Sequence, residues 1–401
     1  MVLGLSVALV TMIVVLVVSA LFDDDQDTLS AERPPTTAAP DDPGPAPESS
    51  APPTTEPEPT IEEVIEDISA FVERERGLEF LTDPVVELAD DEEFEQRLLA
   101  DIEEARPELE DARDLFRALG LIDVETDLYE AQLELLGAGV VGFYDPETDE
   151  LVVRGTDATP YVRNTIAHEL VHALDDQHFD LDRPQLDDAD DESSFGFTSL
   201  VEGNAVRIEE AYAATLTEEE QDEALEEEMS FGSDFDFSAV PLVLLELLSA
   251  PYIYGPDLVD VILEEGDQDR LDAAFAAPPV TSEQVLHPEK FLADEPDLAV
   301  PPPAADGEVF DEGAFGEYPL QVLLADDADA AATEGWGGDA YVAWRTPGDE
   351  TCVRVNVAGD TPEDTEELFE GIDAWGGDLV GATIIDGPPD IGRLVTFTAC
   401  G

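Results

Sequence analysis

Two short stretches of this chain are nearly free of acidic residues, although acids crowd the rest. Asp and Glu make up 99 of the 401 residues, yet residues 158–174 (ATPYVRNTIAHELVHAL) contain one acid, Glu169, and residues 195–208 (FGFTSLVEGNAVRI) contain one, Glu202. Ionised side chains are almost never fully buried unless they are paired. We therefore expect two helices that face the protein interior, each carrying one glutamate that needs a partner there.

The charge balance bears on partners rather than on the fold. The formal net charge is −83, Lys and Arg together number 16, and Lys290 is the only lysine. No nucleic-acid partner is expected, because phosphate binding needs a basic patch. A hypersaline solvent would explain the scarcity of lysine, since salt screens the mutual repulsion of the acids. Because 43% of the residues are apolar, the chain can still build a hydrophobic core.

The N-terminal segment predicts the compartment. Residues 2–22 carry no charged side chain and are followed at once by Asp23, Asp24 and Asp25. About 20 apolar residues suffice to cross a membrane, so residues 1–22 are interpreted as an uncleaved transmembrane anchor. A cleaved signal peptide is the alternative, with Val18-Ser19-Ala20 as a small-residue cleavage site. Either interpretation places the remainder outside the cell, anchored to the cell membrane or secreted.

The rest of the chain divides into three parts by its composition and hydrophobic pattern. Residues 23–60 are rich in Pro, Thr, Ala and acid and predict an extended, solvated linker. Residues 61–334 form a mainly helical region that begins with a capping box of Thr60 and Glu63. Residues 335–401 predict a small α+β end domain. The class is therefore α+β.

Strand and helix patterns fill in this outline. A short strand is expected at 85–88, and a β-hairpin at 139–144 and 151–154. Thr159 and Pro160 then mark the start of the helix that carries Glu169. Further helices are expected at 91–104, 107–119, 126–137, 196–215, 218–229, 239–250, 256–265 and 316–325. The end domain should contain strands at 340–345, 352–357, 382–386 and 393–399 and a helix at 363–375.

The first acid-poor stretch contains the pattern HELVH. His168 and His172 are four residues apart, so on a helix they point from the same face and can grip one cation. Glu169 projects about 100° away from them and can reach a water on that cation rather than ligate it. The pattern favours a zinc ion, with Glu169 as the catalytic base. Core histidines and a surface glutamate are the alternative interpretation.

Zinc in a catalytic site needs a third protein ligand and leaves one position for water. Glu202 is our candidate, because it stands alone among apolar residues on the second helix. A pairing of Glu202 with Arg207, or a solvated position, is the alternative. Glu209 and Glu210 come next as ligands, and His178 qualifies only if the first helix ends before it. Gly203 would let the second helix approach a neighbour closely.

Four motifs in order carry a resemblance. HELVH followed by EGNA resembles the gluzincin arrangement of zinc metallopeptidases, in which two helices cross at the metal. GFYDPETDELVV, AHELVHALDDQHFDL, LVEGNA and LHPEKF together resemble a family of secreted or membrane-anchored metallopeptidases of actinobacteria and haloarchaea. The resemblance covers about residues 60–330. It implies a zincin-like catalytic domain with a β-hairpin before the HExxH helix, one Zn²⁺ and a peptide or protein substrate.

The resemblance also raises the question of supporting residues. Thermolysin-like enzymes place an aspartate four residues after the ligand glutamate, whereas this chain has Val206 there. Asp176, one turn after His172, is the alternative brace, or else a solvated residue at the helix end. His287 is the candidate donor to the oxyanion, against an ordinary loop histidine, with Tyr161 and Tyr212 as further candidates. The strand at 151–154 would pair with an extended substrate, or be a plain core strand.

The two cysteines concern the end domain only. Cys352 and Cys400 lie in expected strands, and outside the cell an even pair favours a disulfide, with free thiols as the alternative. The expected function is zinc-dependent peptide hydrolysis outside the membrane. A non-catalytic acidic cell-surface protein with a structural or vestigial metal site is the alternative, and amide hydrolysis of a non-peptide substrate is a third possibility. Residues 61–137 are expected to shield the site.

Overall fold

The computed structural model describes residues 9–12, 59–100, 102–103, 105–187, 189, 191–232, 240–325, 330–348 and 350–401. The expected linker lies outside these residues except for positions 59 and 60. The expected membrane segment, residues 1–22, lies outside them except for residues 9–12, which pair as a β-strand. The anchor and the signal peptide therefore both stay predictions.

The protein is α+β, as its sequence pattern predicts, and the helices outnumber the strands in the described part of the chain. The strands are β1 (Leu9–Met12), β2 (Val86–Ala89), β3 (Val140–Asp145), β4 (Glu150–Arg154), β5 (Glu308–Gly313), β6 (Trp336–Arg345), β7 (Thr351–Gly359), β8 (Thr383–Asp386) and β9 (Arg393–Cys400). The helices are α2 (Ile61–Arg76), α3 (Asp91–Leu98), α4 (Arg106–Ala118), α5 (Leu128–Gly139), α6 (Pro160–Phe179), α7 (Pro184–Asp187), α8 (Ser193–Ala213), α9 (Glu218–Gly232), α10 (Leu242–Ala276), α11 (Ser282–Leu286), α12 (Pro288–Leu292), α13 (Glu317–Leu324) and α14 (Pro362–Val380), with a 3₁₀ turn at Ala330–Thr333.

Helix starts follow the expected local chemistry. The Thr60 hydroxyl accepts from the Glu63 N–H while the Glu63 carboxylate accepts from the Thr60 N–H, so the predicted capping box of α2 is confirmed. Thr159 caps α6 by accepting from the Val162 N–H, and Pro160 occupies the first helical position. Both caps satisfy backbone donors that a helix end leaves open.

A four-stranded sheet lies beside the helical body, in the order β1-β3-β4-β2. The hairpin of β3 and β4 is antiparallel as expected, and β2 pairs parallel to β4. Because β4 has a strand on each side, it has no free edge, and the expectation that residues 151–154 pair with a substrate is wrong. β1 occupies the outer edge of β3 instead, with Thr11 opposite Gly142.

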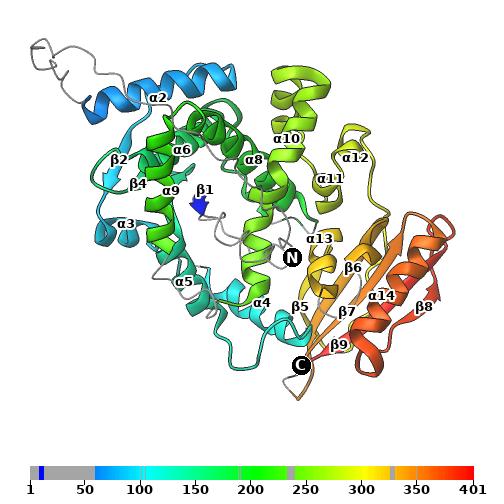
Figure 1. Cartoon of the computed structure of the whole chain (residues 1–401). Helices are drawn as coiled ribbons and strands as arrows, with labels where there is room; N and C mark the ends of the chain where they lie inside the picture. Colours follow the sequence, from blue (N-terminus) through cyan, green and yellow to red (C-terminus); the bar gives the residue numbers. More distant parts are fainter. Residues whose placement is uncertain are drawn as a thin grey trace, which may run out of the picture.

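Three long helices form the centre of the body (Figure 1). α6 and α8 pack against each other, and α10 packs along α8. Gly203 of α8 and Gly255 of α10 meet at the α8–α10 contact, where a Cβ on Gly203 would lie 2.2 Å from the Gly255 carbonyl carbon. The two helices thus touch backbone to backbone, as the prediction for Gly203 requires.

α10 corrects the prediction of two helices separated near residue 251. It continues through Pro251 and Pro256 and breaks only at Gly266 and Asp267, whose backbone angles are not helical. Burial against α8 holds the segment in helical form although each proline removes a backbone donor. By length and composition α10 is the one described helix that is able to cross a membrane, a test that a buried core helix also passes.

A five-stranded sheet in the order β5-β6-β7-β9-β8 forms the C-terminal end, with α14 packed on it (Figure 1). The expected strands and helix of residues 335–401 are all present. The sheet also takes in β5, which precedes the predicted boundary at residue 335. Cys352 and Cys400 are directly opposite on β7 and β9 and form a disulfide.

Candidate metal centre

α6 carries three of the residues that its HELVH pattern singles out. The helix runs unbroken from Pro160 to Phe179, and Asp180 ends it in a left-handed conformation. The rings of His168 and His172 lie 4.8 Å apart, nearly perpendicular to each other. Both rings and the Glu169 side chain are buried. His178 lies within the same helix and its Nε2 contacts the Glu79 carbonyl, so it does not join the pair.

α8 brings Glu202 to the two histidines. Its Oε2 lies 3.1 Å from His168 Nε2 and 3.4 Å from His172 Nε2. One ligand atom from each of the three residues lies within 4.8 Å of the other two, and all three side chains are buried. The expected third ligand therefore comes from a second helix, 30 residues after His172. Glu210, which came next as a candidate ligand, is exposed on the same helix.

These distances fit a metal ion. A tetrahedral zinc with bonds of about 2.0–2.1 Å holds neighbouring ligand atoms about 3.3 Å apart. Both ring nitrogens of His172 are buried, Nδ1 has no hydrogen-bond partner among the described residues, and Nε2 reaches only the Glu202 carboxylate, at 3.4 Å. A buried imidazole with so long a contact is poorly satisfied, and a cation bound to Nε2 would compensate its loss of water. The residues present therefore fit a divalent ion such as Zn²⁺.

The charges of the centre also favour a cation. Burial opposes a charge on His168, but hydrogen bonds with Glu202 and Glu209 outweigh it and raise the pKa of His168 to about 10. Burial likewise opposes ionisation of Glu202, but the charge and hydrogen bonds of the two imidazoles lower the pKa of Glu202 to about 2. The centre is built to hold positive charge between one carboxylate and two imidazoles.

Glu209 supports the centre in a role that the sequence did not assign to it. Its Oε2 lies 2.9 Å from His168 Nδ1, the nitrogen that faces away from Glu202. A carboxylate on the outer nitrogen fixes the ring orientation and the tautomer of a metal-binding histidine. Glu209 follows Glu202 by two helical turns and shares its face, which is the signal that identifies it.

Asp176, the predicted brace, has another role. Its carboxylate accepts from the Tyr144 hydroxyl and from the Leu181 N–H, each at 2.7 Å. It therefore binds the backbone just past the end of α6 and ties that end of the helix to β3. The neighbouring Asp175 points inward and is buried. Which of these two adjacent acids faces the core depends on how α6 is rotated against its neighbours, and one sequence does not show that rotation.

Tyr252 of α10 is a site residue that sequence reasoning missed. Its ring is stacked on His168 at 6.3 Å between centroids. Burial, together with the charge of Glu202 and a hydrogen bond to it, raises the pKa of Tyr252 well above its usual value, so the hydroxyl stays protonated. Tyr252 lies between the two helices that were expected at 239–250 and 256–265. Without a predicted helix there, the sequence offered no face on which to place its side chain.

β3 closes over Glu169. A Cβ on Gly142 would lie 2.8 Å from Glu169 Oε1 and 2.6 Å from Thr165 Cγ2. Glycine at this position lets the strand lie directly on the glutamate of the motif. Sheet and helix therefore fix the position of Glu169 beside the two histidines.

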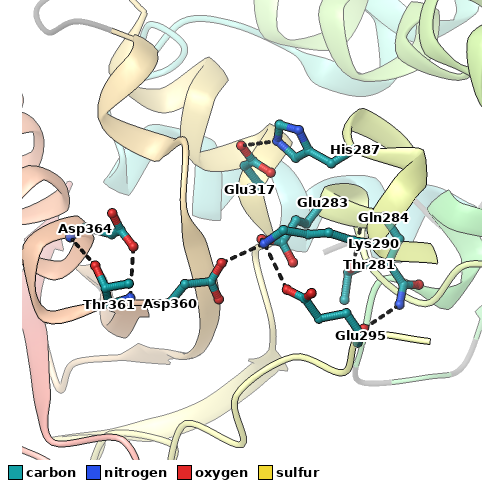
Figure 2. A network of polar contacts seen from close by, with 10 residues as sticks. All are labelled: Thr281, Glu283, Gln284, His287, Lys290, Glu295, Glu317, Asp360, Thr361 and Asp364. Atoms are coloured by element: carbon teal, nitrogen blue, oxygen red, sulfur yellow. Dashed lines mark hydrogen bonds and ion pairs between the residues drawn. The ribbon is translucent and has the colours of Figure 1, made fainter. Parts of the chain in front are cut away.

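The structure does not bring His287 to this centre. Its Nε2 lies 3.1 Å from Glu317 Oε1, and Figure 2 shows this pair beside the contacts of Lys290. Lys290 in turn pairs with Glu283, Glu295 and Asp360, which joins the helical body to the end of β7. His287 thus belongs to the junction with the C-terminal sheet.

The two tyrosines named as further donors have other neighbours. Tyr161, in the first turn of α6, has a pKa raised by burial and by Glu228, Glu209 and Glu227. Tyr212 packs edge-on against Phe71, with 5.3 Å between ring centroids. Neither ring is stacked on the histidine pair, whereas Tyr252 is.

Comparison with known proteins adds one match. The model of a family described as a domain of unknown function, DUF8575, matches residues 306–388, which run from β5 to β8 in the C-terminal sheet. No curated protein and no solved structure matches the chain. The match includes none of the residues of the metal centre, so it carries no statement about their chemistry.

Proposed function

We propose that this protein is a zinc-dependent peptidase with a gluzincin-like centre, acting on peptide or protein substrates outside the membrane. The observation that carries the proposal is the meeting of His168, His172 and Glu202 from two helices, with ligand atoms within 4.8 Å of one another. Glu169 on the same helix as the histidines supplies the fourth element of the pattern. The resemblance of the four sequence motifs to secreted metallopeptidases points the same way.

His168, His172 and Glu202 would hold the ion, which would supply a water of lowered pKa and polarise a carbonyl. Glu169 is the proton acceptor, since it lies on α6 next to His168 but contributes no ligand atom. Glu209 keeps the His168 ring in the orientation that presents Nε2 to the centre. Tyr252 offers a protonated hydroxyl at the carboxylate of Glu202, where it can donate to a negative charge that develops beside the ligands.

Burial favours the second candidate, a structural metal site in a non-catalytic surface protein. His168, Glu169 and His172 are 0% exposed and Glu202 is 1% exposed. A catalytic zinc keeps a position open for water and substrate, whereas a structural zinc is enclosed by protein. The peptidase proposal therefore requires the cover over the centre to move when a substrate binds.

Hydrolysis and metal content separate the two candidates. We expect the full chain, assayed in high salt, to bind about one zinc per chain and to cleave casein until a chelator is added. Glu169→Gln should keep the zinc and lose at least about 100-fold in turnover, because it removes the proton acceptor. Glu210→Gln, on the exposed face of α8, is the matched control and should leave turnover unchanged.

The opposite result is equally definite. A zinc-loaded, folded wild type that never cleaves casein, or whose turnover survives Glu169→Gln, would leave the structural role as the function of this ion. A folded, salt-stabilised sample that takes up no metal would remove both candidates.

A further inference from the structure

The last residue of α2 is a buried arginine. Arg76 is 0% exposed, and it is the only Lys or Arg among the described residues that is buried. Taking a guanidinium out of water costs several kcal/mol unless it is paired and hydrogen-bonded. Because the chain has only 16 Lys and Arg residues, a buried one must be stabilised by specific partners, and these partners show which elements Arg76 connects.

The partners of Arg76 come from two of the three central helices. Nε donates to Asp175 Oδ1 on α6 at 2.6 Å. Nη1 donates to Gln268 Oε1 at 3.0 Å and lies 2.8 Å from Asp272 Oδ1, both on α10. The guanidinium also lies over the rings of Phe179 and Phe275, 5.2 and 5.4 Å from their centroids. Ion pairs and aromatic faces together hold the charge in one place.

Asp175 passes this link on to α8. Its second oxygen, Oδ2, accepts from Asn204 Nδ2 at 2.6 Å, and both residues are fully buried. Asp175 follows the ligand His172 by three residues, and Asn204 follows the ligand Glu202 by two. The chain Arg76–Asp175–Asn204 thus crosses the α6–α8 interface within one helical turn of the metal ligands on both sides.

We propose that Arg76 is a positioning residue of the metal centre, which through Asp175 and Asn204 fixes the α6–α8 spacing at which His168, His172 and Glu202 converge. The inference rests on the proposed function only for the presence of a metal. It also revises the expectation that residues 61–137 only shield the site. α2 is part of the framework of the centre, so removing it would dismantle the centre rather than expose it.

Cobalt binding tests the proposal without reference to hydrolysis. Co²⁺ at a site of two imidazoles and one carboxylate absorbs visible light with an intensity that depends on coordination geometry. We titrate the full chain and its variants Arg76→Met, Arg76→Lys and Asn204→Ala with Co²⁺ in high salt. Circular dichroism confirms that each variant is folded at the temperature used.

Arg76→Met should weaken cobalt affinity by about 10- to 100-fold and alter the visible spectrum, as loss of a residue that supports a metal ligand typically does. Arg76→Lys restores the charge without the fork of donors and should recover part of the affinity. Asn204→Ala leaves the Arg76–Asp175 pair intact and should weaken cobalt binding by itself. This variant therefore tests the proposal if Arg76→Met does not fold.

Two controls separate positioning from general stability. Arg74→Met removes a 61%-exposed arginine from the same helix. Val355→Ala opens a cavity in the core of the distant C-terminal sheet and lowers stability without touching α6 or α8. Both should bind cobalt as the wild type does. Wild-type affinity and spectrum in the folded Arg76→Met and Asn204→Ala variants would overturn the proposal. A wild type that binds one cobalt but never cleaves casein would refute the peptidase function and leave this inference standing.

Discussion

Glu192, at the start of α8, shows how the fold changes the chemistry of a single carboxylate. Its Oε2 accepts from the Ser282 N–H at 2.9 Å and from the Ser282 hydroxyl at 3.0 Å. The carboxyl packs directly on Gly316, where a Cβ would lie 1.9 Å away. Burial raises the pKa of Glu192 to about 8, with Asp339 adding to the shift and Ser282 opposing it.

This shift predicts a pH dependence of stability. The folded state keeps a proton on Glu192 up to about pH 8, whereas the unfolded chain loses it near the ordinary glutamate pKa of 4.5. The folded state therefore binds more protons between these values, so this group lowers the free energy of unfolding as the pH rises from about 4.5 to about 8, by about 4 kcal/mol in all.

Glu192→Gln should remove that slope. A glutamine oxygen still accepts from Ser282, so the variant should match the wild type near pH 4.5 and exceed its stability above pH 8. Urea unfolding at several pH values measures the difference, with Glu289→Gln at an exposed position as the control. An equal pH dependence in the wild type and Glu192→Gln would show that Glu192 titrates normally.

At the scale of elements, the contact between α8 and α10 controls the geometry of the centre. Gly203 directly follows the ligand Glu202, and Gly255 follows Tyr252 by three residues. A Cβ on Gly255 would lie 2.2 Å from the Ser199 carbonyl oxygen. The obstacle is backbone, which cannot rotate aside, so any side chain at either glycine must push the helices apart.

Gly203→Ala should therefore cost about 1–3 kcal/mol in the free energy of unfolding, the usual cost of overpacking, although alanine is the better helix former. It should also weaken metal binding, because Glu202 moves away from the histidines. Denaturant unfolding and a zinc titration measure both effects. Gly139→Ala is the control, since its Cβ would meet only Leu135 Cδ1 at 3.6 Å. Unchanged stability and zinc affinity in Gly203→Ala would contradict the close packing of α8 on α10.

The whole molecule carries a formal net charge of −83, and from this charge we expect its stability to depend on salt. Repulsion among so many carboxylates opposes the compact state. The attractive contacts of Lys290 at the junction (Figure 2) engage only a few of the acids. Because the Debye length falls from about 10 Å at 0.1 M salt to about 3 Å at 1 M, salt relieves the repulsion between surface acids far more than it weakens buried pairs.

The midpoint of thermal unfolding should thus rise as NaCl increases from about 0.1 M to about 1 M, most steeply at the low end, where the screening length changes fastest. Sucrose at matched osmolality is the control for general exclusion of solutes from the surface, and it should reproduce little of the rise. If sucrose stabilises the protein as much as NaCl does, charge repulsion does not limit its stability.

The sequence by itself determined the features that depend on a few neighbouring residues. Thr60 with Glu63 marked the start of α2, and Thr159 with Pro160 marked that of α6, because caps act within one turn. The four-residue spacing of His168 and His172 determined a shared face. The absence of any other acid from residues 195–208 indicated that the helix carrying Glu202 faces the interior, because charged side chains are mostly exposed.

Only the tertiary structure decided which distant groups meet. It gave the support of His168 to Glu209 rather than Asp176, placed Tyr252 on the histidines, and directed His287 to Glu317. It also enclosed β4 between two strands and carried α10 through two prolines. Each outcome depends on how helices and strands pack, which involves contacts as distant as that of Arg76 with Asp175. Local periodicity sets the direction of a side chain on its own element, but the packing of elements against one another sets what that side chain reaches.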